Sequence, residues 1–73
     1  MPSTTIRTAG DFGTSVREAR REQGMTQREL ALAVGAGERF IVELENGKEN
    51  ARLGKALRVA SALGLRLTLG GNP

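Results

Sequence analysis

The sequence contains no cysteine, histidine, tryptophan or tyrosine, and its only aromatic residues are two phenylalanines. The missing cysteines and histidines exclude disulfides, thiolate or imidazole metal sites and cysteine nucleophiles, and they remove the most common general acid and base of enzymes. A chain of 73 residues also has little room for a catalytic cleft, so only scattered carboxylates remain as catalysts. We therefore expect no enzymatic activity, no metal and no cofactor.

Long apolar runs are missing as well. No stretch approaches the length of a membrane span, and the first residues lack the apolar core of a signal peptide, so we expect a soluble cytoplasmic protein without membrane contact. A domain this short buries only about 60% of its unfolded surface, so a partner subunit would add to a small core. The net charge of +3 is by itself only a hint of a polyanionic partner.

A helix is predicted to start at the centre of the chain. Thr26 and Glu29 have the spacing of a capping box, in which each side chain accepts a hydrogen bond from the other residue's backbone N–H. Gly35 lies where a left-handed cap would end this helix. The apolar stripe between these points consists of Leu30, Ala31 and Val34.

A second short helix is predicted directly after residues 35–37. It starts at Glu38, buries Ile41 and Leu44, and stops at Asn46 and Gly47. Two helices this short, joined by a glycine turn, must cross steeply and lean on other helices. This is the helix-turn-helix arrangement.

The chain before this pair predicts an arm and a helix. Residues 1–7 are polar and are expected to form a flexible arm. Thr8 and Asp11 suggest a second capping box, which opens a helix lasting until Gln23. Gly10 and Gly13 each cost up to about 1 kcal/mol relative to alanine, so we expect this helix to fray at its start. Its apolar stripe consists of Phe12, Val16 and Ala19.

The chain after the pair predicts a longer helix and then a change of period. Asn50 is a suitable N-cap, and Gly64 closes the helix. The predicted stripe is Leu53, Ala56, Leu57, Ala60 and Leu63. Residues 65–69 then alternate between apolar and polar side chains, which is typical of a β-strand.

A single strand in a helical chain needs an edge to pair with. We expect it to pair with the same strand of a second copy through Leu65, Leu67 and Leu69, or with the arm that carries Ile6. The alternative is a loose C-terminal tail.

Together, the segments TQRELA, FIVELENGK and ALRVASALGL resemble the Xre/Cro-type helix-turn-helix family, over residues 8–64. The closing LRLTL is similar to HipB-like antitoxins of that family, whose C-terminal strand pairs between subunits and which bind a HipA-type kinase toxin. The resemblance implies an all-α, four-helix Xre/Cro-type domain with a short C-terminal β-strand pairing between subunits. It divides the chain into an arm (1–7), a DNA-binding domain (8–64), a dimerisation strand (65–69) and a flexible tail (70–73).

The resemblance also implies where DNA would lie. The first helix of the pair lies across the phosphate backbone, with Gln27 as a phosphate contact, and the second helix enters the major groove. Arg28 would reach a phosphate or a base edge. Alternatively, Gln27 only fills the first helical turn and Arg28 is an exposed arginine without a role. Further phosphate contacts are expected from Asn46, Lys48 and Arg52, and weaker ones from Arg7 and Arg17.

The resemblance assigns base contacts to the outward residues Glu38, Arg39, Val42 and Glu43. Arg39 is the strongest candidate, because its planar fork matches the two acceptors of guanine, which is worth about 1–3 kcal/mol of discrimination. Arg39 and Glu43 could instead pair with each other at the i, i+4 spacing. Val42 would touch a thymine methyl group. Glu38 departs from the family, which often has an uncharged side chain there.

Arg20 and Glu45 match a buried ion pair of the family that ties the first helix to the end of the reading helix. The alternative is two solvated charges. The sequence thus predicts a homodimeric, sequence-specific repressor on a palindromic operator, as the antitoxin of a HipBA-like module that also binds a kinase-type toxin. The competing interpretation is a protein-interaction adaptor that keeps the helical core but no longer binds DNA, which the acids Glu38 and Glu43 favour.

Overall fold

Four α-helices form the protein in the computed structural model, which describes residues 5–69. They are α1 (Ala9–Glu22), α2 (Gln27–Val34), α3 (Glu38–Glu45) and α4 (Leu53–Ala62). The all-α fold and all four predicted helices are confirmed. No helix in the described part of the chain is long and apolar enough to cross a membrane.

The N-terminus of α1 differs in detail from the sequence prediction. Thr8 is the N-cap, and its hydroxyl accepts a hydrogen bond from the backbone N–H of Asp11 at 3.0 Å. The Asp11 carboxylate, however, accepts from the backbone N–H of Arg7 and not from that of Thr8. The predicted capping box is therefore only half formed, because the Asp11 carboxylate bonds the N–H of Arg7 in place of that of Thr8.

The helix-turn-helix forms as its local signals predict. The Thr26 backbone N–H donates to the Glu29 carboxylate at 2.8 Å, and the Glu29 backbone N–H donates to the Thr26 hydroxyl at 3.0 Å. Gly35 ends α2 with a left-handed backbone. Its φ is 70°, a value that residues with a Cβ rarely adopt. α3 then begins after Gly37, whose lack of a side chain leaves this helix start without a side-chain cap.

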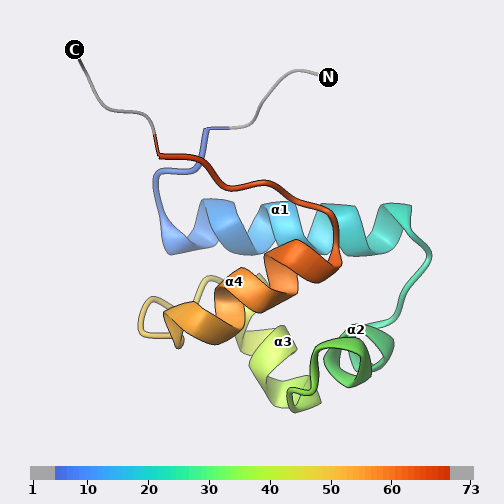
Figure 1. Cartoon of the computed structure of the whole chain (residues 1–73). Helices are drawn as coiled ribbons and strands as arrows, with labels where there is room; N and C mark the ends of the chain where they lie inside the picture. The colour runs from blue at the N-terminus through green and yellow to red at the C-terminus, as the bar shows by residue number, and fades with distance from the viewer. Residues whose placement is uncertain (1–4, 70–73) are drawn as a thin grey trace.

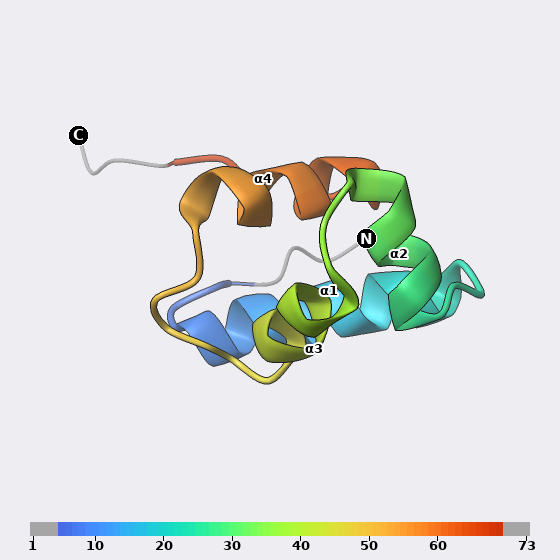
Figure 2. The same ribbon diagram turned by 90° about the horizontal axis from the view of Figure 1, so that it is seen from below.

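The core lies between the helices, with α3 packed against both α1 and α2, and α2 against α4. Seen from below, α3 lies in front of α1 (Figure 2). Four large side chains at the centre are fully buried, one from each helix: Val16, Leu30, Ile41 and Val59. The predicted stripes of α2 and α3 are buried as expected, whereas Phe12 and Ala19 of α1 are only partly buried against the core.

Helix α4 begins later than predicted and is rotated relative to the predicted stripe. Arg52, not Asn50, occupies the N-cap position. Leu53 and Leu57, which the stripe placed in the core, are 71% and 45% exposed. Ala56, Ala60 and Leu63 of the predicted stripe are buried as expected, and Val59, which the stripe omitted, is fully buried with them. The prediction was wrong for Leu53 and Leu57 because two overlapping stripes are possible along α4, and only the neighbouring helices select between them.

After α4, residues 65–69 run back past α1, on the side of that helix away from α2 and α3 (Figure 1). Leu65 packs against the core, and its backbone N–H donates to the Ala60 carbonyl at 2.9 Å. No strand hydrogen bonds form among the described residues of the single chain. The predicted strand needs a second copy, so its pairing stays a prediction. Most of the predicted arm (1–4) and the predicted tail (70–73) lie outside the described residues.

Candidate nucleic-acid interface

Helix α3 carries an inner and an outer face, as predicted. Ile41 and Leu44 are buried, whereas Glu38 and Arg39 are exposed at the first turn. Val42 and Glu43 are half-buried on the same outer side. The outward residues of α3 therefore form a short polar ridge with one apolar side chain in it.

Glu43 holds two cations on this ridge. Arg39 Nε lies 3.4 Å from Glu43 Oε2, and Lys48 Nζ lies 3.1 Å from Glu43 Oε1. The hydrogen bond from Lys48, together with the nearby positive charges, holds the pKa of the Glu43 carboxyl below its usual range. The Arg39 side chain is nevertheless 89% exposed. Since exposed ion pairs contribute little, Arg39 can leave Glu43 for another acceptor at small cost.

The start of α2 is tied to the end of α3 through Gln27. Its side chain is the first of α2, is half-buried, and donates from Nε2 to Glu45 Oε1 at 3.1 Å. Sequence reasoning missed this contact, because Gln27 and Glu45 are far apart in the chain. Arg28, the next residue, is exposed. Its cation lies beside the positive end of the α2 dipole, where an anion would be favoured.

Arg20 and Glu45 form a buried ion pair between α1 and α3, as the resemblance implied. Arg20 Nε donates to Glu45 Oε2 at 2.6 Å and Arg20 Nη2 to Glu45 Oε1 at 3.0 Å, a two-pronged contact. Arg20 Nη1 also donates to the Met25 carbonyl at 2.7 Å. Burial pushes the pKa of Glu45 upward, but the donors Arg20 and Gln27 outweigh it and hold this pKa below its usual range. The hydrogen bonds that Arg20 donates to Glu45 raise the pKa of Arg20.

The loop after α3 presents further polar groups on the same side. Asn46, Lys48 and Arg52 are exposed there, in the positions predicted to contact phosphate. Gly47 has a φ of 84°, and a Cβ on it would lie 3.0 Å from the Gly10 Cα. The loop is thus held against the start of α1. Arg17, one turn before Arg20, lies with its Nε 3.8 Å from Glu45 Oε1, and its side chain is 45% exposed.

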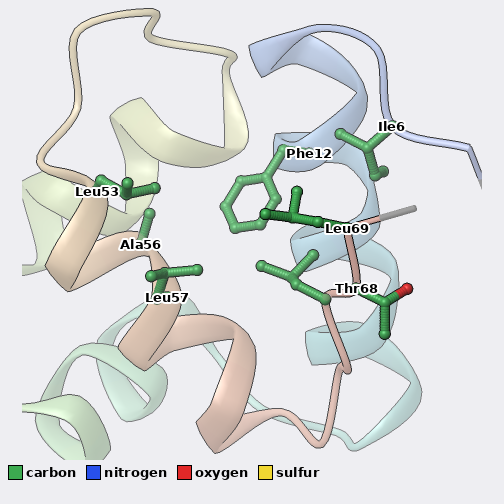
Figure 3. A pocket seen from close by; sticks show the side chains of 8 residues that line it. Ile6, Phe12, Leu53, Ala56, Leu57, Thr68 and Leu69 are labelled. Carbon is green, nitrogen blue, oxygen red and sulfur yellow. The ribbon is translucent and has the colours of Figure 1, made fainter. Parts of the chain in front are cut away.

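A second surface feature is an apolar groove where the two ends of the described chain meet (Figure 3). Its volume is about 530 Å³. Leu67 is 46% exposed beside it and Leu69 fully exposed, whereas the third predicted interface residue, Leu65, is partly buried in the core of its own chain. The sequence analysis named the arm that carries Ile6 as a second possible partner of this segment, and Ile6 does line the groove, but the walls from α1 and α4 were not anticipated. The lining residues are Ile6, Phe12, Leu53, Ala56, Leu57, Leu67, Thr68 and Leu69.

Comparison with known protein families gives a match over most of the chain. The helix-turn-helix family HTH_3 matches residues 16–69, which includes α2, the turn, α3 and α4. The chain is 47% identical over 64 residues to y4mF, an HTH-type transcriptional regulator of Sinorhizobium fredii, and the match covers 88% of this chain and 84% of y4mF. It is also 47% identical over 51 residues to an HTH-type transcriptional regulator of Methanothermobacter thermautotrophicus, covering 70% of this chain and 74% of the relative.

Solved structures agree with the sequence comparisons. The fold is similar to that of HipB in a HipB–O4 20mer complex, with a TM-score of 0.85, 25% sequence identity, and 97% of this chain and 100% of that chain covered. A chain of a HipA–HipB–O2–O3 complex matches with the same TM-score, identity and coverage.

Proposed function

The chain belongs to the helix-turn-helix family HTH_3, and from this premise we propose that it is a sequence-specific transcriptional repressor that binds a palindromic operator as a homodimer. The main support is the arrangement of α3, whose buried Ile41 and Leu44 leave Arg39 exposed on the opposite side. A helix of this kind fits the major groove of double-stranded DNA, which admits one α-helix.

Base reading is assigned to the ridge on α3. Arg39 would donate two hydrogen bonds to guanine, and Val42 would contact a thymine methyl group. Glu43 would keep Arg39 and Lys48 close to the ridge, and Glu38 would accept from a cytosine amine or orient a neighbouring arginine. Phosphate contacts are assigned to the exposed or half-exposed polar residues around the ridge: Gln27, Arg28, Asn46, Lys48 and Arg52.

The apolar groove supports the homodimer. Leu53 and Leu57 on α4 and Leu67 and Leu69 after it leave apolar surface in water that a second copy would cover. The residues that line the groove belong to α1, α4 and the segments outside the helices, and none belongs to α2 or α3, so that a dimer joined there would leave both copies of α3 free. Two such copies would read half-sites in successive major grooves, about 34 Å apart.

Similarity to HipB in a HipB–O4 20mer complex and in a HipA–HipB–O2–O3 complex supports a narrower role. We assign the chain to the antitoxins of HipBA-like modules, which repress their own operon and neutralise a kinase-type toxin in the cytoplasm. The toxin would contact a surface away from α3. The competing adaptor function is favoured by the acids Glu38 and Glu43 on the ridge, because acids near phosphates repel.

Selection from random duplexes with the purified protein tests the proposed function. We expect enrichment of a palindrome, and for Arg39→Ala a loss of about 1–3 kcal/mol of discrimination at one base pair per half-site. Arg21→Ala is the control, because it removes the same charge from an exposed position in the last turn of α1, outside the residues assigned to DNA contacts and to the dimer. Binding that does not weaken with salt, or no enriched sequence, would favour the adaptor.

A matched pair of leucines tests the homodimer. Leu53, in the groove, is 71% exposed, and Leu32, on α2 and outside the groove, is 73% exposed. We expect Leu53→Glu to give a monomer in analytical ultracentrifugation, because two buried carboxylates would face an apolar interface, whereas Leu32→Glu stays dimeric. If both variants keep the mass of a dimer, the subunits associate elsewhere.

A further inference from the structure

One carboxylate oxygen in this protein serves three side chains from two helices. Glu45 Oε1 lies 3.0 Å from Arg20 Nη2, 3.1 Å from Gln27 Nε2 and 3.8 Å from Arg17 Nε. The Glu45 side chain is fully buried and that of Arg20 is 8% exposed, whereas Arg17 is 45% exposed. Glu45 therefore contacts one buried side chain, Arg20, and one that reaches the surface, Arg17.

The Arg20 contact pairs the charge of Glu45. Arg20 meets both oxygens of the carboxylate. Gln27 adds a further donor to the buried carboxylate, and Arg17 approaches the same oxygen from the surface. Both side chains therefore lie against Glu45, although its charge is already paired by Arg20.

An ionised carboxylate only accepts hydrogen bonds, so the Gln27 amide must turn its nitrogen toward Glu45 and not its oxygen. A primary amide carries two N–H groups, and one of them remains for another acceptor. The phosphodiester groups of DNA are also pure acceptors, so the second N–H of an amide fixed in this way can donate to one of them. Arg17 Nε lies within ion-pair distance of the same oxygen, at 3.8 Å, so that its two terminal nitrogens remain for a phosphate.

We propose that Glu45 is a positioning residue for DNA binding, which orients the Gln27 amide and the Arg17 guanidinium as a preset pair of phosphate donors. The inference rests on the proposed function and deepens it. Glu45 itself need not touch DNA. It acts through Gln27 and Arg17, and the cost of ordering these side chains is met in the free protein and not on binding.

A double-mutant cycle tests the coupling, with a fluorescent duplex of mixed sequence as the probe. Gln27→Ala should weaken binding of the otherwise unaltered protein about tenfold per subunit, the usual size for a hydrogen bond to a charged group. In the Glu45→Gln background the same change should cost at most about twofold, because the orientation is already lost. Arg17→Ala should reduce the slope of log K against log salt by about 1 per subunit. Gln27→Ala should leave this slope unchanged, because glutamine carries no charge.

A measurement on the unaltered protein covers the case in which Glu45→Gln does not fold. In NMR spectra of the free protein, one side-chain N–H of Gln27 should exchange with solvent more slowly than those of the exposed Asn50. On addition of the duplex, the other N–H of Gln27 should shift and become protected, while the first stays unchanged.

The outcomes separate the two proposals. If the unaltered protein shows no salt-dependent binding to any duplex, the proposed function fails. If it binds, but Gln27→Ala costs the same in both backgrounds or both N–H groups of Gln27 exchange as fast as those of Asn50, only the positioning role of Glu45 is overturned.

Discussion

Gly13→Ala is expected to prevent the stable packing of α1 against α3, although alanine is the better helix former. Gly13 is buried where the two helices cross, and a Cβ on it would clash with the Leu44 carbonyl oxygen and would lie 2.8 Å from that of Glu45. Both atoms belong to backbone, so no side chain can turn away and α3 itself would have to move. Overpacking of this kind costs about 1–3 kcal/mol or more.

Gly10→Ala is the matched control in the same helix. A Cβ at Gly10 would meet nothing closer than the Thr8 hydroxyl at 3.5 Å, an ordinary contact. We expect thermal unfolding, followed by circular dichroism, to show an unchanged or higher Tm for Gly10→Ala and a large decrease for Gly13→Ala. Equal Tm values for the two variants would mean that the crossing can widen at no cost. The close approach at Gly13 also corrects the sequence analysis, which treated both glycines only as weak points of α1.

Arg20→Ala is expected to destabilise the fold by about 3–5 kcal/mol, because it leaves the Glu45 carboxylate buried without its main partner. For a domain of this size, a loss of about 3 kcal/mol lowers the Tm on the order of 10–25 °C. Arg21→Ala removes the same charge from an exposed position one residue later, and it should change the Tm very little. Equal Tm values would exclude a stabilising role of the pair.

The pH dependence of the free energy of unfolding tests the same ion pair in a second way. The pKa of Glu45 in the folded protein lies below its ordinary value of 4.5, so the unfolded chain binds the proton more readily. The stability from this group is therefore complete above about pH 4.5 and is lost as the pH falls through the lower folded-state pKa. In Glu45→Gln this part of the acid dependence should be absent, as measured by urea unfolding at several pH values.

The helices and the turn could be predicted from the sequence because their signals are local. The Thr26 and Glu29 box, the glycine at position 35 and the inward pair Ile41 and Leu44 depend only on neighbours within one or two turns. The Arg20 and Glu45 pair is not local. It was reached through resemblance to a family, since nothing in the spacing of two charges so far apart brings them together.

Contacts that depend on the crossing of helices were missed for the same reason. The close approach at Gly13 exists only because α3 ends there, and the Gln27 amide finds Glu45 only once α2 and α3 are folded against each other. The exposed face of α4 is a third case. Leu53 and Leu57 look like core residues in the sequence, and only the position of α2 decides that Val59 takes that place.

The two ends of α3 differ in how firmly contacts with the rest of the protein hold them. Its last residues, Leu44 and Glu45, are gripped by the backbone of α1 at Gly13 and by the guanidinium of Arg20, whereas its first residue follows Gly37 without a side-chain cap. The C-terminal end of such a helix is held more rigidly than its N-terminal end. Glu38 and Arg39 lie at the N-terminal end of α3. Small adjustments of their backbone are therefore cheap, while the angle at which the whole helix projects is fixed from its far end.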